Sequence, residues 1–279
     1  MPLLKLKKIS LALLLILFAT ACAPSYPVDT LEKKAKELIK AETDIDSYVI
    51  LKDKTLFVYA NITGINTDLS ASNDVYNTIQ KIVMLATRVS LSTDAKIDFY
   101  HVTIASEENG LQIIFKQYIE DIKCWFYGTI GRSDFFKRSL LETKIGEKGT
   151  TFNPETVKPI TMPDFILSQT TYRFISTLDE EIQELKQQRI KNIKDETKIL
   201  EIDEKIKAKT VWTLVAENTL IKKEYVNQRF KYEFKEFDEA NLLDINYKDF
   251  HKNFANVHNS VCDIYKFKQQ APVDIKIKT

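Results

Sequence analysis

The chain has 279 residues, of which 44% are hydrophobic and 28% are charged, so it carries enough apolar material to bury a core, and global disorder is excluded. Its 40 basic and 39 acidic residues give a formal net charge of +1, so no excess of positive charge directs it to nucleic acid. With only 6 Gly and 7 Pro, Gly-rich phosphate-binding loops and many-turned β sandwiches are disfavoured. We expect regular helices and hairpins instead.

The first 21 residues have the layout of a secretory signal peptide. Lysines at positions 5, 7 and 8 form a basic start, an apolar run covers 9–18, and small residues occupy 19–21. The apolar stretch is roughly 13 residues long, whereas a helix that spans a bilayer needs about 20. We therefore expect this segment to be inserted and then removed. Its removal leaves 37 basic against 39 acidic residues, a net charge of −2.

Cys22 follows the small residues directly, and Ala19-Thr20-Ala21-Cys22 resembles the lipobox of bacterial lipoproteins, with Ala at the position where Leu is commonest. The resemblance implies cleavage before Cys22 and lipid, including palmitate, on its thiol. It also implies a bacterial cell-envelope location, and Ala23 in place of Asp implies the outer membrane, facing the periplasm. The alternative is an ordinary signal peptide that is cut before a cysteine. Residues 22–29, which include two prolines, then predict a short tether.

Residues 30–145 predict one α+β domain. Apolar positions at helical spacing predict helices, and alternating β-branched and aromatic residues predict strands. In chain order we expect a helix at 31–42, strands at 47–51 and 55–62, a helix with its apolar stripe at 75–89 and a cap at Ser72 or Asn73, strands at 97–105 and 111–115, a helix at 118–127, and a helix capped by Ser133 that includes Phe135, Phe136, Leu140 and Leu141. The simplest closure is an antiparallel sheet of about four strands with helices on one face.

Glycines and prolines cluster at 146–163, where neither the helical spacing nor the strand alternation of apolar residues continues. This composition predicts a linker. Residues 164–279 predict a mainly helical, charged region. A coiled coil is one option for its long first part, although the heptad breaks between Leu185 and Ile190. The rest predicts mixed helix and strand at 211–237, an amphipathic helix at 247–265, and an extended tail at the end of the chain.

Three adjacent aromatic residues, Trp125, Phe126 and Tyr127, lie in the helix expected at 118–127. Three successive side chains of a helix point in different directions, so they cannot all face one core. At least one of them should be exposed, and we interpret the three as a contact point for a partner. The alternative is that they are enclosed between the sheet and the following helix.

A Gly-rich turn at 128–131 precedes Arg132, Ser133, Lys137 and Arg138. Backbone N–H groups at the start of a helix, together with nearby cations, favour contact with an anion. The glycine spacing and lysine of a Walker loop are missing, and a plain turn followed by a helix cap explains the same residues.

His251, His258 and Cys262 fall within about 40° of one another on the expected C-terminal helix. These residues are the candidates for a metal site, but they also border the apolar stripe of the helix, and we expect no metal and no other cofactor. Once Cys22 carries lipid, Cys124 and Cys262 remain as either a disulfide pair or two free thiols.

The sequence contains a candidate lipid anchor and a long charged helical region, and we find no catalytic motif in it. These features predict a non-catalytic assembly, adaptor or scaffolding module that contacts other envelope proteins, with no nucleic-acid partner. The alternatives are an envelope hydrolase with dispersed active-site residues and a carrier of a small or lipidic ligand. An enzyme should have a deep polar pocket, whereas an adaptor should have a broad exposed apolar or aromatic patch.

Overall fold

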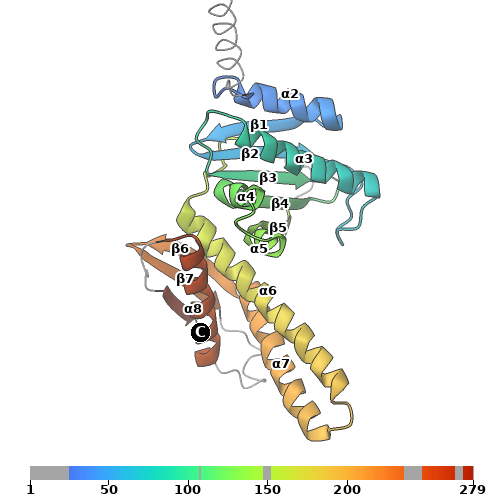
Figure 1. Cartoon of the computed structure of the whole chain (residues 1–279), viewed down its shortest axis with the longest axis vertical. Coiled ribbons are helices and arrows are strands. Elements are labelled where there is room, and N and C mark those ends of the chain that lie inside the picture. The colour runs from blue at the N-terminus through green and yellow to red at the C-terminus, as the bar shows by residue number, and fades with distance from the viewer. Residues whose placement is uncertain (1–24, 107, 147–151, 236–246, 268–272, 279) are drawn as a thin grey trace, which may run out of the picture. The chain divides into compact units, whose positions relative to one another are not determined.

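The computed structural model describes residues 25–106, 108–146, 152–235, 247–267 and 273–278 (Figure 1). The expected signal peptide and Cys22 lie outside these residues. The chain divides into two compact units, Met1–Pro159 (unit 1) and Ile160–Thr279 (unit 2), and the division falls within the segment 146–163. Within the described ranges, no helix combines the length and the apolarity that crossing a membrane requires.

Unit 1 contains a five-stranded sheet in the order β1-β2-β3-β4-β5. Its strands are β1 (Ser47–Lys52), β2 (Thr55–Asn61), β3 (Phe99–Ala105), β4 (Leu111–Tyr118) and β5 (Leu140–Ile145). Its helices are α2 (Leu31–Thr43), α3 (Asn73–Leu91), α4 (Ile119–Phe126) and α5 (Arg132–Arg138). The α+β class is confirmed, but the prediction of about four antiparallel strands is wrong, because the sheet has five strands and is mixed.

The parallel pair is β2 and β3, which align from Thr55 opposite Phe99 to Asn61 opposite Ala105. The chain leaves β2, crosses over through α3 and enters β3 in the same direction, and a parallel pair needs such a long crossover. The other three strand pairs, β1–β2, β3–β4 and β4–β5, are antiparallel. The hairpins were therefore predictable from local patterns, whereas the pairing between them was not.

The fifth strand replaces part of a predicted helix. The helix expected from Ser133 ends at Arg138, and Ser139 is already extended. Leu140 then pairs with Lys116, and Leu141 pairs with Phe115. Pairing with β5 satisfies backbone N–H and C=O groups that would otherwise be left open along β4. The free energy gained from these hydrogen bonds exceeds the helix preference that the spacing of Leu140 and Leu141 indicated.

One face of the sheet carries the core of unit 1. Alternate residues of the central strands, among them Leu56, Val102 and Ile104, pack against Leu31 of α2 and Ile82 of α3. All five side chains are fully buried. The first residues of α4 join the same core, so the helices of unit 1 gather on one side of the sheet, as Figure 1 shows.

Unit 2 combines a helical hairpin with a three-stranded sheet, β6-β7-β8. Its elements are α6 (Met162–Lys191), α7 (Glu196–Asn218), β6 (Leu220–Val226), β7 (Arg229–Lys235), α8 (Tyr247–Ile264) and β8 (Val273–Lys278). Asn227 and Gln228 both have positive φ and form the two-residue turn between β6 and β7. The expected extended tail is β8, which pairs in parallel with β7.

The core of unit 2 is mainly aromatic. Phe230, Tyr232 and Phe234 alternate along β7 and point to the same side, where they meet Phe250 and Phe254 of α8. Each of these five side chains is fully buried. Edge-to-face ring contacts contribute stability beyond the burial of their area.

We predict that Phe254→Ala lowers the free energy of unfolding by about 3–5 kcal/mol, because it removes a ring that contacts Phe174, Tyr232 and Phe234 and leaves a cavity. Ile193→Ala is the control and should change it by less than about 0.5 kcal/mol, since Ile193 is exposed. Urea unfolding followed by circular dichroism measures both. Equal midpoints for Phe254→Ala and the unmodified protein would contradict this core.

Candidate functional site

An exposed aromatic surface lies at the junction of α4 and α5. Ile119 and Ile122 hold the start of α4 in the core, and the end of the helix projects beyond them. The three successive aromatic residues stand there, with Trp125 39%, Phe126 61% and Tyr127 81% exposed. They are on the surface rather than enclosed between the sheet and the following helix.

Two further rings extend this surface, and we call Trp125, Phe126, Tyr127, Phe135 and Phe136 the aromatic patch. Trp125 stacks on Phe135 with ring centroids 4.8 Å apart and also contacts Phe126 at 5.2 Å. Phe136 meets the edge of Phe135 and is 56% exposed. The sequence interpretation missed the two α5 rings as site residues, because only the turn at 128–131 brings α5 back beside α4.

The cations predicted to contact an anion lie on α5, beside these rings. The Arg132 guanidinium sits over the Phe136 ring, 5.6 Å from its centroid, and Lys137 is exposed. Arg138 instead forms a largely buried ion pair with Asp121 of α4, at 2.9 Å, and so holds the two helices together. Ser133 does not cap the helix, because α5 begins at Arg132 with Gly131 in the capping position.

A second exposed surface ends the hairpin of α6 and α7, drawn in yellow and orange in Figure 1. Ion pairs join Arg189 to Asp203 and Lys209 to Glu181, so the two helices run antiparallel. The segment for which a coiled coil was one option is therefore a helical hairpin within one chain. Three aliphatic side chains near the connecting turn, which we call the arm tip, are 62%, 69% and 66% exposed (Ile190, Ile193 and Leu200).

The arm tip lies beyond the core of unit 2. The last buried side chain of α6 is Ile182, and the first of α7 is Ile202. From Ile182 to the end of α6 the helix continues for nine residues, or about 14 Å at 1.5 Å per residue. The aliphatic side chains at the tip therefore contribute little to the stability of the unit that carries them.

His258 and Cys262 belong to a buried polar cluster of unit 2. The Nδ1 atom of His258 lies 3.1 Å from the Tyr232 hydroxyl and 3.2 Å from Thr170 Oγ1, and its Nε2 lies 3.4 Å from Cys262 Sγ. Burial lowers the pKa of His258 to about 4 and raises the pKa of Cys262 to about 11. A nucleophilic or metal-binding cysteine needs a lowered pKa, so the geometry makes this cluster part of the core.

The cysteines and the third metal candidate lie elsewhere. Cys124 in unit 1 and Cys262 in unit 2 are both free thiols. His251 makes none of the contacts of the His258 cluster and lines the hollow described next. Among the residues that the structure places, no group of three or more His, Cys, Asp or Glu side chains is arranged to hold a metal ion.

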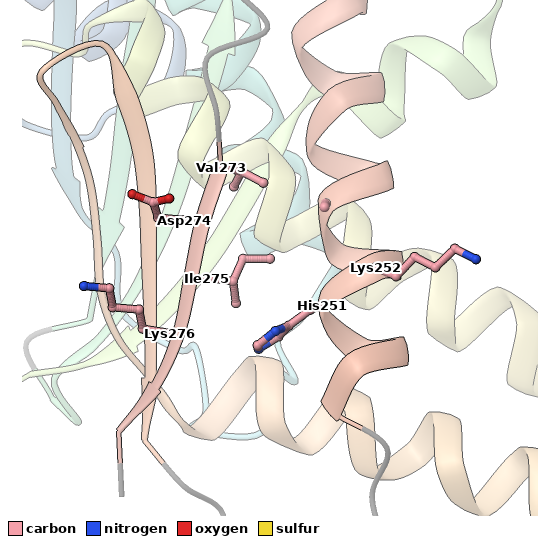
Figure 2. A pocket seen from close by; sticks show the side chains of 7 residues that line it. His251, Lys252, Val273, Asp274, Ile275 and Lys276 are labelled. Atoms are coloured by element: carbon pink, nitrogen blue, oxygen red, sulfur yellow. The ribbon is translucent and has the colours of Figure 1, made fainter.

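An open hollow of about 530 Å³ lies between α8 and β8 of unit 2. Figure 2 shows His251, Val273 and Ile275 directed into the space between helix and strand, whereas Lys252, Asp274 and Lys276 point away from it. The Nε2 atom of His251 is buried there without a hydrogen-bond partner, and burial lowers the pKa of this imidazole. Two apolar side chains and one imidazole thus face the space, and charged residues of the same helix and strand border it.

Comparisons of the chain with protein-family models, with curated proteins and with solved structures found no match. The function is therefore argued from the chemistry of its own residues. Two exposed surfaces, the aromatic patch and the arm tip, are its strongest features.

We predict that unit 2 loses stability in acid because of His258. Its pKa of about 4 in the folded chain lies below the ordinary 6.5, so between these values the unfolded chain binds a proton that the folded chain excludes. The contribution of the neutral His258 to the free energy of unfolding is complete above about pH 6.5 and is lost as the pH falls towards 4. The pKa difference corresponds to a total loss of about 3 kcal/mol.

Urea unfolding at about pH 7 and about pH 4.5 tests this dependence. His258→Gln, which does not ionise, should show a smaller acid-induced loss than the unmodified protein. His251→Gln on the same helix is the control and should retain most of the loss, because His251 is only half-buried. The same acid dependence in His258→Gln and the unmodified protein would rule out this role of the imidazole.

Proposed function

We propose that this protein is a bacterial envelope lipoprotein, anchored through lipid on Cys22, that works as a non-catalytic adaptor. Its arm, formed by α6 and α7, contacts other envelope proteins. The observation that carries this proposal is the arm tip, where three aliphatic side chains stand exposed at the end of a helical hairpin. Exposed aliphatic side chains that do not support the core of their own unit are available for an interaction surface.

The chemistry of the arm tip indicates the kind of partner surface that it fits. Burying one Ile or Leu side chain contributes about 1.5–3 kcal/mol, so three of them can supply the centre of an interface. Residues 186–204 around them contain five basic and five acidic residues, and Arg189 is paired with Asp203. A complementary partner therefore offers an apolar groove with a polar rim of mixed charge.

The membrane anchor rests on the signal-peptide layout and the lipobox resemblance of Ala19-Thr20-Ala21-Cys22. An anchored adaptor needs a fixed end and a stiff reaching element. The helical hairpin supplies this reaching element, and ion pairs of Arg189 with Asp203 and of Lys209 with Glu181 link its two helices. We place the protein on the outer membrane, facing the periplasm, as the residue after Cys22 implies.

We predict that Cys22→Ser abolishes labelling of the protein by a fatty acid in bacteria and releases it from the membrane fraction. Cys124→Ser is the matched control and should label normally, because Cys124 lies in α4 and outside the lipobox. Gel fluorography of cells fed a labelled fatty acid measures both variants. Undiminished labelling of Cys22→Ser would refute the anchor.

We predict that the double variant Ile193→Asp, Leu200→Asp loses its crosslinks to envelope proteins in living cells, because two charges replace the apolar centre of the contact. Glu204→Gln is the control on an exposed arm position and should retain the same crosslinked partners. Mass spectrometry of crosslinked complexes gives the comparison, and circular dichroism verifies the fold. Identical crosslinks in both variants would contradict an adaptor role for the arm.

A further inference from the structure

We infer that the aromatic patch on α4 and α5 is a second membrane contact, which inserts into the lipid–water interface of the membrane that holds the Cys22 lipid. This inference rests on the proposed lipid anchor. It names lipid, rather than a protein, as the occupant of this surface.

The tether between Cys22 and unit 1 is short. Ser25, the first described residue, is three positions after Cys22, and an extended residue spans at most about 3.6 Å, so their Cα atoms lie within about 11 Å of each other. Tyr26 is already part of unit 1, because its side chain is buried and its N–H donates to the carbonyl of Ser92 at 3.2 Å. A lipid on Cys22 therefore brings the surface around Ser25 to the lipid headgroups.

Helix α4 begins at the same end of the sheet as the tether. The backbone N–H of Val28 donates to the Asp94 carboxylate at 2.8 Å. A few residues further along, the carbonyl of Asp98 accepts from Ile119, the first residue of α4, at 2.9 Å. Asp98 itself immediately precedes β3. In Figure 1 the start of α2 and the whole of α4 lie at the left ends of the strands of unit 1.

The side chains of the aromatic patch suit the lipid–water interface. Trp125 and Tyr127 combine an apolar ring with a polar N–H or O–H group, and such side chains concentrate at the headgroup level of membranes. Phe126 and Phe136 add apolar rings that can enter the acyl boundary, and Arg132 next to Phe136 can pair with lipid phosphate. The arm tip, by contrast, presents aliphatic side chains without this aromatic pattern.

Vesicle binding by the mature chain with Cys22→Ser tests the inference without the lipid anchor. The probe is vesicles of phosphatidylethanolamine and phosphatidylglycerol at millimolar lipid, with partitioning measured by flotation. Phe126→Ser combined with Tyr127→Ser should reduce partitioning at least about 10-fold, which corresponds to about 1.4 kcal/mol. Ile193→Ser combined with Leu200→Ser removes equally exposed side chains from the arm tip and should leave partitioning unchanged.

A fluorescence measurement locates the contact. In a Trp212→Phe background Trp125 is the remaining tryptophan, and brominated lipid should quench its emission. The inference is overturned if the Cys22→Ser chain does not bind vesicles, if the patch variant binds as strongly as its parent, or if Trp125 is not quenched. It is also overturned if the patch variant loses a protein crosslink while its vesicle binding is unchanged. Each of these outcomes is independent of fatty-acid labelling at Cys22.

Discussion

Burial of one face of the five-stranded sheet is the constraint on which the rest of unit 1 depends. Leu56, Val102 and Ile104 lie on that face and are completely shielded by packed helices. Because strand side chains alternate, this burial determines which face every paired residue occupies. The chain that leaves β4 must then return Ile119 and Ile122 to the same core. The rest of α4 projects from the core, and the aromatic patch is the consequence.

The two exposed surfaces differ in chemistry and in mechanical support. The aromatic patch joins rings with polar tips to Arg132 on a compact part of unit 1, and this composition suits the boundary between lipid and water. The arm tip has aliphatic side chains on a braced helical hairpin, which suits an apolar groove on a protein. The two proposed contacts, one with a membrane and one with a protein, thus use separate surfaces of different composition.

Local patterns predicted the elements whose stabilising contacts are close in sequence. The helix expected from its apolar stripe at 75–89 is α3, Asn73–Leu91, and the strand expected at 55–62 is β2, Thr55–Asn61. Failures came where pairing partners are distant. β5 pairs with β4 across α4 and α5, and β3 pairs in parallel with β2 across α3. The spacing of apolar residues within one segment does not show which distant strand will pair with it.

The sequence by itself determined which segments have the apolar spacing of a helix and which have the alternation of a strand. It also determined that Trp125, Phe126 and Tyr127 cannot all be buried together, because successive side chains point in different directions. Only the tertiary structure decided that Phe135 stacks on Trp125, that Asp121 holds Arg138, and that α4 starts at the tether end of the sheet. The reason is that these contacts depend on which strands pair and in which direction. That choice is made by burial and backbone hydrogen bonding across the whole unit.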